Sequence, residues 1–139
     1  MKHTLTILAA LGIIVSALAL REHYRTEGDA PCSINERWDC GIVNHSPYAV
    51  LRGVPVAALG IIGYLLMAAL SWRRAYQLLL IVAATGLGFS LYLAQIEARV
   101  LGVWCIYCVI SLADISLITL LALATTLASQ FRKSSELFS

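Results

Sequence analysis

Long apolar runs separated by short polar segments dominate this chain. Apolar residues fill positions 4–20, 54–71, 76–97 and 104–129 almost without interruption. A helix of about 20 apolar residues spans the hydrocarbon core of a bilayer. The pattern therefore predicts four transmembrane helices in an all-α integral membrane protein. Only a very short turn separates the second run from the third, so we expect these two helices to form an antiparallel hairpin.

The first run also has the features of a secretory signal peptide. It follows Lys2 and His3, and it contains Ala17-Leu18-Ala19, which has the A-x-A form of a cleavage site. The alternative is an uncleaved transmembrane helix. We favour the uncleaved helix, because the four-helix arrangement described below requires it.

Residues 21–53 form the only extended polar segment, which we call the outer loop, and it contains Cys32 and Cys40. Two patterns predict short helices within it. Ser33 followed by Glu36 resembles a capping box, which places one short helix between the cysteines. Ser46 followed by Pro47 predicts the start of a second, amphipathic helix. This second helix would run through Tyr48, Ala49, Leu51 and Arg52.

The composition supports a membrane protein and argues against a nucleic-acid partner. The chain has 139 residues, enough for one domain, of which 60% are hydrophobic and 13% are charged. Soluble domains contain about 25% charged residues. A net charge of +2 without a basic cluster is too small for phosphate neutralisation. We therefore expect a single domain over residues 1–139 that contacts membrane lipids and no nucleic acid.

Four spans place both termini and Arg73-Arg74 on one side of the membrane, opposite the outer loop and residues 104–108. Each side carries five Lys or Arg residues: Lys2, Arg73, Arg74, Arg132 and Lys133 on the terminal side; Arg21, Arg25, Arg37, Arg52 and Arg99 on the other. The terminal-side cations occupy much shorter segments, so the positive-inside rule places the termini in the cytoplasm. We expect a multi-pass protein of the cell (inner) membrane, with its cysteines on the periplasmic or extracellular side.

The four cysteines form two pairs, Cys32 and Cys40 with C-x7-C spacing and Cys105 and Cys108 with C-x-x-C spacing. A C-x-x-C at a helix start places both sulfurs within one turn, and the helix N-terminal amides favour a thiolate at Cys105. Cys108 lies one turn deeper, where it can meet a lipid-soluble oxidant. Exchange between the pairs proceeds through mixed disulfides. The alternatives are two structural disulfides or a four-cysteine zinc site. We favour redox chemistry and expect no metal.

The order of these motifs resembles the vitamin K epoxide reductase (VKOR) family in its prokaryotic form. The resemblance covers roughly residues 4–128 and rests on the two cysteine pairs with Ser46 between them. Further matching stretches are Asn44-His45-Ser46-Pro47-Tyr48, Gly53-Val54-Pro55, Leu59-Gly60 and Gly63-Tyr64. The family implies a four-helix bundle around a quinone, here ubiquinone or menaquinone.

The resemblance also implies a route for electrons. They pass from a reduced thioredoxin-like protein to the outer-loop pair, then to the C-x-x-C pair and then to the quinone, which supports disulfide bond formation. Cys108 is then the quinone-facing thiol, Cys105 exchanges with the outer loop, and Ser46 lies at the rim of the pocket. Many relatives carry a fused thioredoxin-like domain, for which this chain has no room. We therefore expect a separate partner of the DsbA type.

Further pocket residues are expected on two helices. Ser111, Leu112 and Ile115 share the Cys108 face, and Val56 and Tyr64 belong to the second helix. Tyr64 either offers a hydroxyl to a quinone oxygen or anchors the helix at the membrane interface, the commoner role of a tyrosine near the end of a span. The animal enzymes have a tyrosine at the Leu112 position and an asparagine at the Val56 position. Both departures fit simple quinone reduction better than epoxide reduction.

An acid also lies inside the fourth run. An intramembrane acid is a functional candidate, so Asp114 is either a proton relay or a protonated residue bonded to a neighbouring helix. We favour the second interpretation, since Asp114 is six residues past Cys108 and points away from that sulfur.

Two rival functions remain. A DsbB-type quinone reductase has four spans and two cysteine pairs, but its C-x-x-C lies in the first outer loop, the reverse of the order here. A non-catalytic tetraspan scaffold or metal-binding protein with structural cysteines is the alternative from another class.

Overall fold

The computed structural model describes residues 1–24, 47, 50–102 and 104–138. Four long helices account for most of them: α1 (Lys2–Tyr24), α3 (Val56–Trp72), α4 (Tyr76–Ile96) and α5 (Ile106–Phe138). The expected sites at Cys32, Cys40 and Ser46, and the short helix between the two outer-loop cysteines, lie outside the described residues. The predominance of long helices among the described residues confirms the prediction of an all-α membrane protein.

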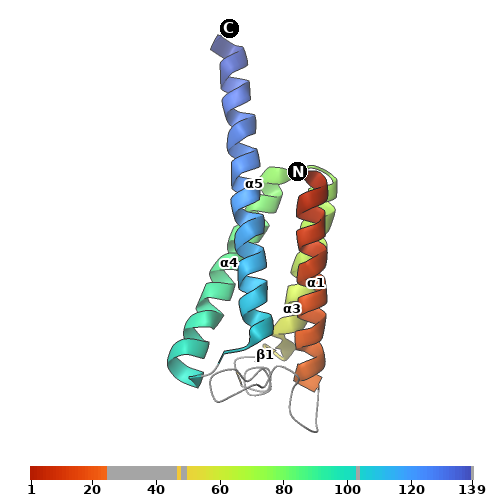
Figure 1. Ribbon diagram of the computed structural model, residues 1–139, viewed down its shortest axis with the longest axis vertical. Helices are drawn as coiled ribbons and strands as arrows, with labels where there is room; N and C mark the ends of the chain where they lie inside the picture. Colours follow the sequence, from red (N-terminus) through yellow and green to blue (C-terminus); the bar gives the residue numbers. More distant parts are fainter. Residues whose placement is uncertain (25–46, 48–49, 103, 139) are drawn as a thin grey trace.

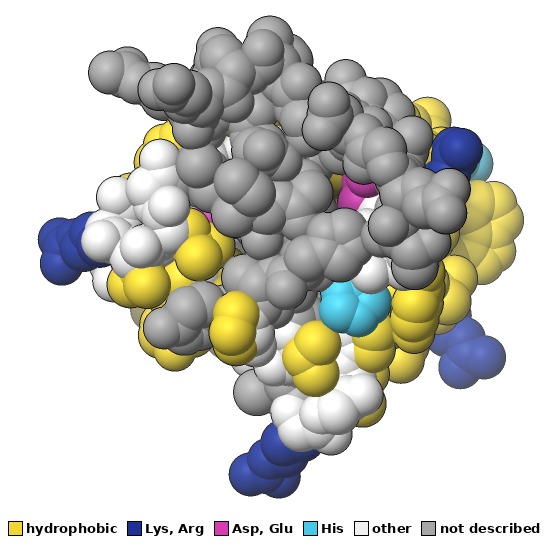
Figure 2. All heavy atoms as spheres, turned by 90° about the horizontal axis from the view of Figure 1, so that it is seen from below, with side chains coloured by type: hydrophobic (Ala, Val, Ile, Leu, Met, Phe, Trp, Pro, Cys, Tyr) yellow, Lys and Arg dark blue, Asp and Glu magenta, His cyan; other side chains and the backbone are white. Residues whose placement is uncertain are grey.

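Within the described part of the chain, three helical segments are long and apolar enough to cross a membrane. They are Lys2–Tyr24, Tyr76–Leu101 and Ile106–Phe138, whereas the apolar helix α3 has 17 residues. At 1.5 Å per residue, α3 is about 25 Å long, somewhat shorter than a hydrocarbon core of about 30 Å. Large apolar side chains face outward from every helix, among them Ile7, Ile62, Ile81 and Leu120. Viewed from one end, hydrophobic side chains line much of the rim (Figure 2).

The helix ends differ from the sequence prediction in three places. Helix α1 begins at Lys2 and runs on to Tyr24, and α5 begins at Ile106 and continues to Phe138. The predicted third helix ends its regular α-helical part at Ile96, where a five-residue π-helix, η2 (Glu97–Leu101), takes over. The segment past position 129 continues the helix, because it contains several residues with high helix propensity and no proline or glycine.

A short hairpin precedes α3 where the sequence predicted an amphipathic helix. Strand β1 (Val50–Leu51) pairs antiparallel with β2 (Val54–Pro55). The two residues between them, Arg52 and Gly53, have φ angles of 51° and 83°. Two successive positive φ angles make a tight two-residue turn that matches the twist of the strands. The predicted helix is therefore wrong at positions 50–52, and Tyr48 and Ala49 lie outside the described residues.

Both termini lie at one end of the bundle, and the hairpin and the start of α5 lie at the other (Figure 1). Helix α1 packs mainly against α3, and α4 packs mainly against α5. The shared core consists of small and aliphatic side chains together with one tyrosine: Leu5, Ala9, Tyr64, Met67, Leu79, Ala83, Ile115, Ile118 and Ala122. Small residues allow helices in a membrane to approach closely.

Polar contacts join α1 to α3 at the terminal end. The Ser71 hydroxyl donates a hydrogen bond to the Lys2 carbonyl at 3.1 Å and lies 3.2 Å from the Thr6 hydroxyl. The Lys2 ammonium lies 3.9 Å from the centre of the Trp72 ring. The exposed Trp72 thus holds a cation at the end of the bundle where both termini lie, and tryptophan is enriched at membrane interfaces.

Candidate functional site

The C-x-x-C pair lies at the N-terminal end of α5. The backbone N–H of Val109 donates to the Cys105 carbonyl at 3.0 Å, which makes Cys105 the residue that precedes the first helical turn. Cys108 follows within that turn. Cys105 is fully buried, with 0% of its surface exposed, and Cys108 is half-buried. The local sequence explains this start, because Gly102 has a φ of 70° and ends the preceding helical segment.

An acid lies beside the two thiols. The carboxylate Oε2 of Glu97 accepts a hydrogen bond from the backbone N–H of Cys105 at 3.2 Å. The same side chain lies within hydrogen-bonding distance of the Cys108 thiol, which is also within reach of the Cys105 thiol. Glu97 is only 3% exposed. The site therefore consists of two sulfurs and one carboxylate, of which Cys105 and Glu97 are withdrawn from bulk water and Cys108 is half-buried.

The π-helix η2 and the turn after it bring Glu97 to this position. Glu97 opens η2, and the chain then reverses at Gly102 before it reaches Cys105. A π-helical turn inserts extra backbone relative to an α-helix and is frequent at functional sites. Residue types and spacing along the sequence assign Glu97 no role at the thiols. The available signal was an acid at the end of an apolar run, eight residues before the first thiol.

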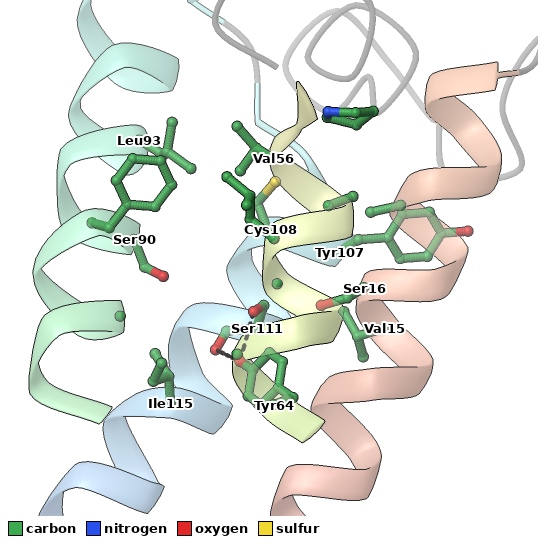
Figure 3. Close-up of a pocket in the computed structure, with 18 of the residues that line it drawn as sticks. Val15, Ser16, Val56, Tyr64, Ser90, Leu93, Tyr107, Cys108, Ser111 and Ile115 are labelled. Carbon is green, nitrogen blue, oxygen red and sulfur yellow. Dashed lines mark hydrogen bonds between the residues drawn. The ribbon is translucent and has the colours of Figure 1, made fainter. Parts of the chain in front are cut away.

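A cavity of about 410 Å³ extends from Cys108 into the bundle. All four long helices contribute to its walls, which are mainly apolar, and Figure 3 shows the Cys108 sulfur at one end of it. A few polar side chains interrupt these walls, among them Ser16, Ser90 and Ser111. Ligand sites are commonly cavities of about 300–1,000 Å³ with apolar walls and a few placed polar groups.

Five of the residues expected in the pocket line this cavity: Val56, Tyr64, Cys108, Ser111 and Ile115. Leu112 is half-buried and is not among the lining residues. Positions i, i+3 and i+7 on a helix form one stripe, and here they are Cys108, Ser111 and Ile115. Leu112, at i+4 from Cys108, lies on the other side of that stripe. Ser46, Cys32 and Cys40 lie outside the described residues, and their roles stay predictions.

The Tyr64 hydroxyl is engaged within the protein. It donates to the Ser111 carbonyl at 3.1 Å and lies 2.8 Å from the Ser111 hydroxyl (Figure 3). Gly12 on α1 lies against the Tyr64 ring, so closely that a Cβ atom there would overlap the ring carbons. These contacts connect α1, α3 and α5 across the cavity wall, one turn of α5 beyond Cys108.

Asp114 is buried and lies off the cavity. It is 7% exposed, and its Oδ2 atom has no hydrogen-bond partner among the described residues. Neither of the interpretations given for it from the sequence is decided by this placement. Metal ligation has no support in the described part of the chain, where no group of three or more His, Cys, Asp or Glu side chains is placed to hold an ion. The four-cysteine alternative depends on Cys32 and Cys40, which are not described.

Comparison with profiles of protein families relates the chain to a known family. Residues 3–127 match the profile described as "Vitamin K epoxide reductase family". The matched segment contains both cysteine pairs, the hairpin, Glu97 and most of α5. It therefore includes every element that builds the cavity.

Proposed function

The chain belongs to the vitamin K epoxide reductase family, and from this membership we propose that it is a quinone-dependent thiol oxidoreductase of the membrane. Its substrates are the dithiol of a separate thioredoxin-like protein of the DsbA type and a quinone, either ubiquinone or menaquinone. The partner dithiol loses two electrons and two protons and becomes a disulfide, and the quinone becomes a hydroquinone. The product disulfides then serve oxidative folding.

The observation that carries this proposal is the position of the Cys108 thiol in the wall of an apolar cavity. A quinone ring is flat, largely apolar and soluble in lipid, so it fits walls of this kind better than a charged acceptor does. The cavity volume of about 410 Å³ is within the range of small-molecule sites. A bound quinone would supply the chemistry of a two-electron acceptor at the Cys108 end of the cavity.

The chain's own residues would carry the electrons to that point. Cys105 and Cys108 are one turn apart with their thiols in contact, so they are suited to close a disulfide as the electrons leave. Cys32 and Cys40 would reduce that disulfide by thiol–disulfide exchange and take electrons from the partner in turn. The burial of Cys105 keeps small external thiols away from this step.

The membrane arrangement is part of the proposal. We infer that α3 crosses the bilayer together with the three longer segments, because it packs against α1 along the bundle (Figure 1). Residues 1–139 then form a single four-span domain in the cell (inner) membrane. The termini and Arg73-Arg74 face the cytoplasm, and the outer loop with its cysteines faces the periplasm or cell exterior.

Quinone reduction by a reduced thioredoxin-like dithiol tests the proposal. The purified protein in lipid nanodiscs should reduce a short-chain ubiquinone, followed by the change in its ultraviolet absorbance. Cys108→Ala should abolish this reaction. Cys105→Ala should abolish it too but trap a different set of mixed disulfides on non-reducing gels. Ser116→Ala is a matched control, because Ser116 also lies on α5 but hydrogen-bonds only the Leu112 carbonyl in the described structure. Unchanged turnover in Cys108→Ala would sink the mechanism.

A further inference from the structure

We propose that the Glu97 carboxylate is the base that removes the proton from the Cys108 thiol and passes it into the cavity. This inference rests on the proposed function, because it assigns a proton route to the same pair of thiols. Glu97 would then be a catalytic residue, since its side chain touches a reacting sulfur.

Contact geometry is the first support. The Glu97 side chain reaches both members of the C-x-x-C pair: it accepts the Cys105 N–H at 3.2 Å and lies within hydrogen-bonding distance of the Cys108 thiol. A general base has to lie within hydrogen-bonding reach of the proton that it removes. The hydrogen bond from the Cys105 N–H fixes the orientation of the carboxylate beside the Cys108 thiol.

Burial is the second support. Thiolates react and thiols do not, so each turnover requires a proton to leave Cys108. Glu97 is 3% exposed and Cys105 is 0% exposed, which leaves little bulk water beside the sulfurs to accept that proton. Glu97 itself lines the cavity next to Cys108. A proton on the Glu97 carboxyl group is therefore next to the cavity in which the quinone would bind.

The local backbone is the third support. Membrane acids are costly to bury, and those that persist usually serve a function. Here a change from α-helical to π-helical hydrogen bonding begins at this very residue, and Gly102 then turns the chain back so that Cys105 meets it. An acid without a function at the end of a membrane helix would need neither the π-helical turn nor the chain reversal at Gly102.

The proposed step conserves atoms and electrons. The S–H bond of Cys108 breaks and an O–H bond forms on Glu97, with no change of oxidation state. The thiolate and Cys105 then give up two electrons to the quinone as the S–S bond forms. The second proton comes from the Cys105 thiol, which is in contact with Cys108, and leaves through the same carboxylate. Both protons end on the hydroquinone, and Glu97 returns to its ionised form.

Other titratable groups share the surroundings and have to be separated from Glu97. His23 of α1, Tyr64 of α3 and Tyr107 of α5 line the same cavity, and Arg99 lies exposed on η2. Among these groups, Glu97 is the one within hydrogen-bonding distance of the Cys108 thiol. A test therefore has to remove the basicity of Glu97 while it leaves the cavity walls intact.

Glu97→Gln provides that change, because the glutamine carbonyl can still accept the Cys105 N–H bond. Thiol-dependent quinone reduction should fall about 100-fold or more at pH 7, the usual contribution of a general base, and should recover as the pH rises and hydroxide replaces the carboxylate. Glu22→Gln is the matched control, since it makes the same change at another buried acid, on α1, that is not among the residues lining the cavity. It should change the rate less than threefold.

A second readout needs no quinone. The rate of Cys108 alkylation by N-ethylmaleimide, followed by mass spectrometry, should rise in two steps with pH in the wild type, because the thiol and the carboxyl share protons as a coupled pair. Glu97→Gln should lose the low-pH step and shift the high-pH step to lower pH, because a negative charge has been removed. Glu22→Gln should keep both steps.

The outcomes separate this inference from the proposed function. A Glu97→Gln variant with the wild-type rate, or with a loss that stays the same at every pH, would overturn the base role and leave the oxidoreductase proposal standing. An inactive wild type would refute the oxidoreductase, and the alkylation profiles would still decide the role of Glu97. If Glu97→Gln does not fold, the alkylation profiles of the wild type and of Glu97→Asp test the proposal instead. A wild-type rate that rises in a single step with pH refutes it. A low-pH step that persists with reduced amplitude in Glu97→Asp supports it.

Discussion

Among the glycines of the described residues, Gly12 should be the one at which a single added methyl group destabilises the bundle most. A Cβ atom at Gly12 would overlap the Cδ1, Cε1 and Cζ atoms of the Tyr64 ring. The ring has little freedom to yield, since Tyr64 is buried and its hydroxyl is bonded to Ser111 on a third helix. The Gly12→Ala variant therefore has to push α1 outward or break the Tyr64–Ser111 contact.

The magnitude follows from two costs and one gain. Overpacking a tight core costs about 1–3 kcal/mol, and loss of the tyrosine hydrogen bond adds about 1 kcal/mol. Alanine in place of glycine inside a helix gives back about 1 kcal/mol. Gly88→Ala on α4 is the matched control, because it has the same propensity gain and no atom within 4 Å of its added Cβ. The free energy of unfolding should therefore differ between the two variants by about 2–4 kcal/mol.

The assay is reversible unfolding in mixed micelles of dodecylmaltoside and sodium dodecyl sulfate, followed by far-ultraviolet circular dichroism. In a double-mutant cycle, Tyr64→Leu should relieve most of the cost of Gly12→Ala, because the smaller side chain leaves room for the methyl group. Equal stabilities of Gly12→Ala and Gly88→Ala, or additive effects in the cycle, would refute the reasoning that the ring is held in place.

Three further changes test other contacts with the same unfolding assay. Tyr64→Phe should lower the free energy of unfolding by about 1 kcal/mol through the lost hydroxyl bonds, whereas Tyr92→Phe, on an exposed ring, should have no measurable effect; equal effects would contradict the role of the Ser111 contact. Gly102→Ala should cost about 1–2 kcal/mol, because φ is 70° there, and should slow quinone reduction by displacing Cys105; wild-type stability and rate would refute this. Lys2→Gln should lower the free energy of unfolding by about 0.5–1 kcal/mol, because the contact with the Trp72 ring is lost. If Lys2→Gln lowers it equally in a Trp72→Leu background, the loss has another cause.

The helices and the family were accessible from the sequence because both depend on patterns that are dense along the chain. Apolar runs fix where helices can lie in a bilayer, and the order of the cysteine pairs indicated the family that the profile match confirms. The helical stripe through Cys108, Ser111 and Ile115 likewise follows from helix geometry alone. The same geometry also predicted Leu112 in the cavity wall. Leu112 is four residues after Cys108, on the other side of the stripe, and does not line the cavity.

The hairpin and the acid beside the thiols were not accessible in the same way. Residues 50–55 read Val-Leu-Arg-Gly-Val-Pro, which is too short a stretch to show the periodicity of a helix or of a strand, and Arg52-Gly53 is a weaker turn signal than Asn-Gly. The π-helical turn at Glu97 differs from an α-helix only in its hydrogen bonding, which composition does not reveal. The contact between Glu97 and the thiols depends on how the chain reverses at Gly102, and such a reversal is decided by tertiary packing.

The pairing of the helices has a consequence for biogenesis. Helix α1 packs mainly on α3, and α4 packs mainly on α5, while the cavity takes its walls from all four. The first pair is synthesised before the second, so a nascent chain can hold two helices in the bilayer with half of the cavity wall still missing. The C-x-x-C sulfurs follow with the last helix. Under the proposed function, electron transfer to a quinone would therefore have to wait for completion of the bundle, and unfinished chains would leave the membrane quinone pool untouched.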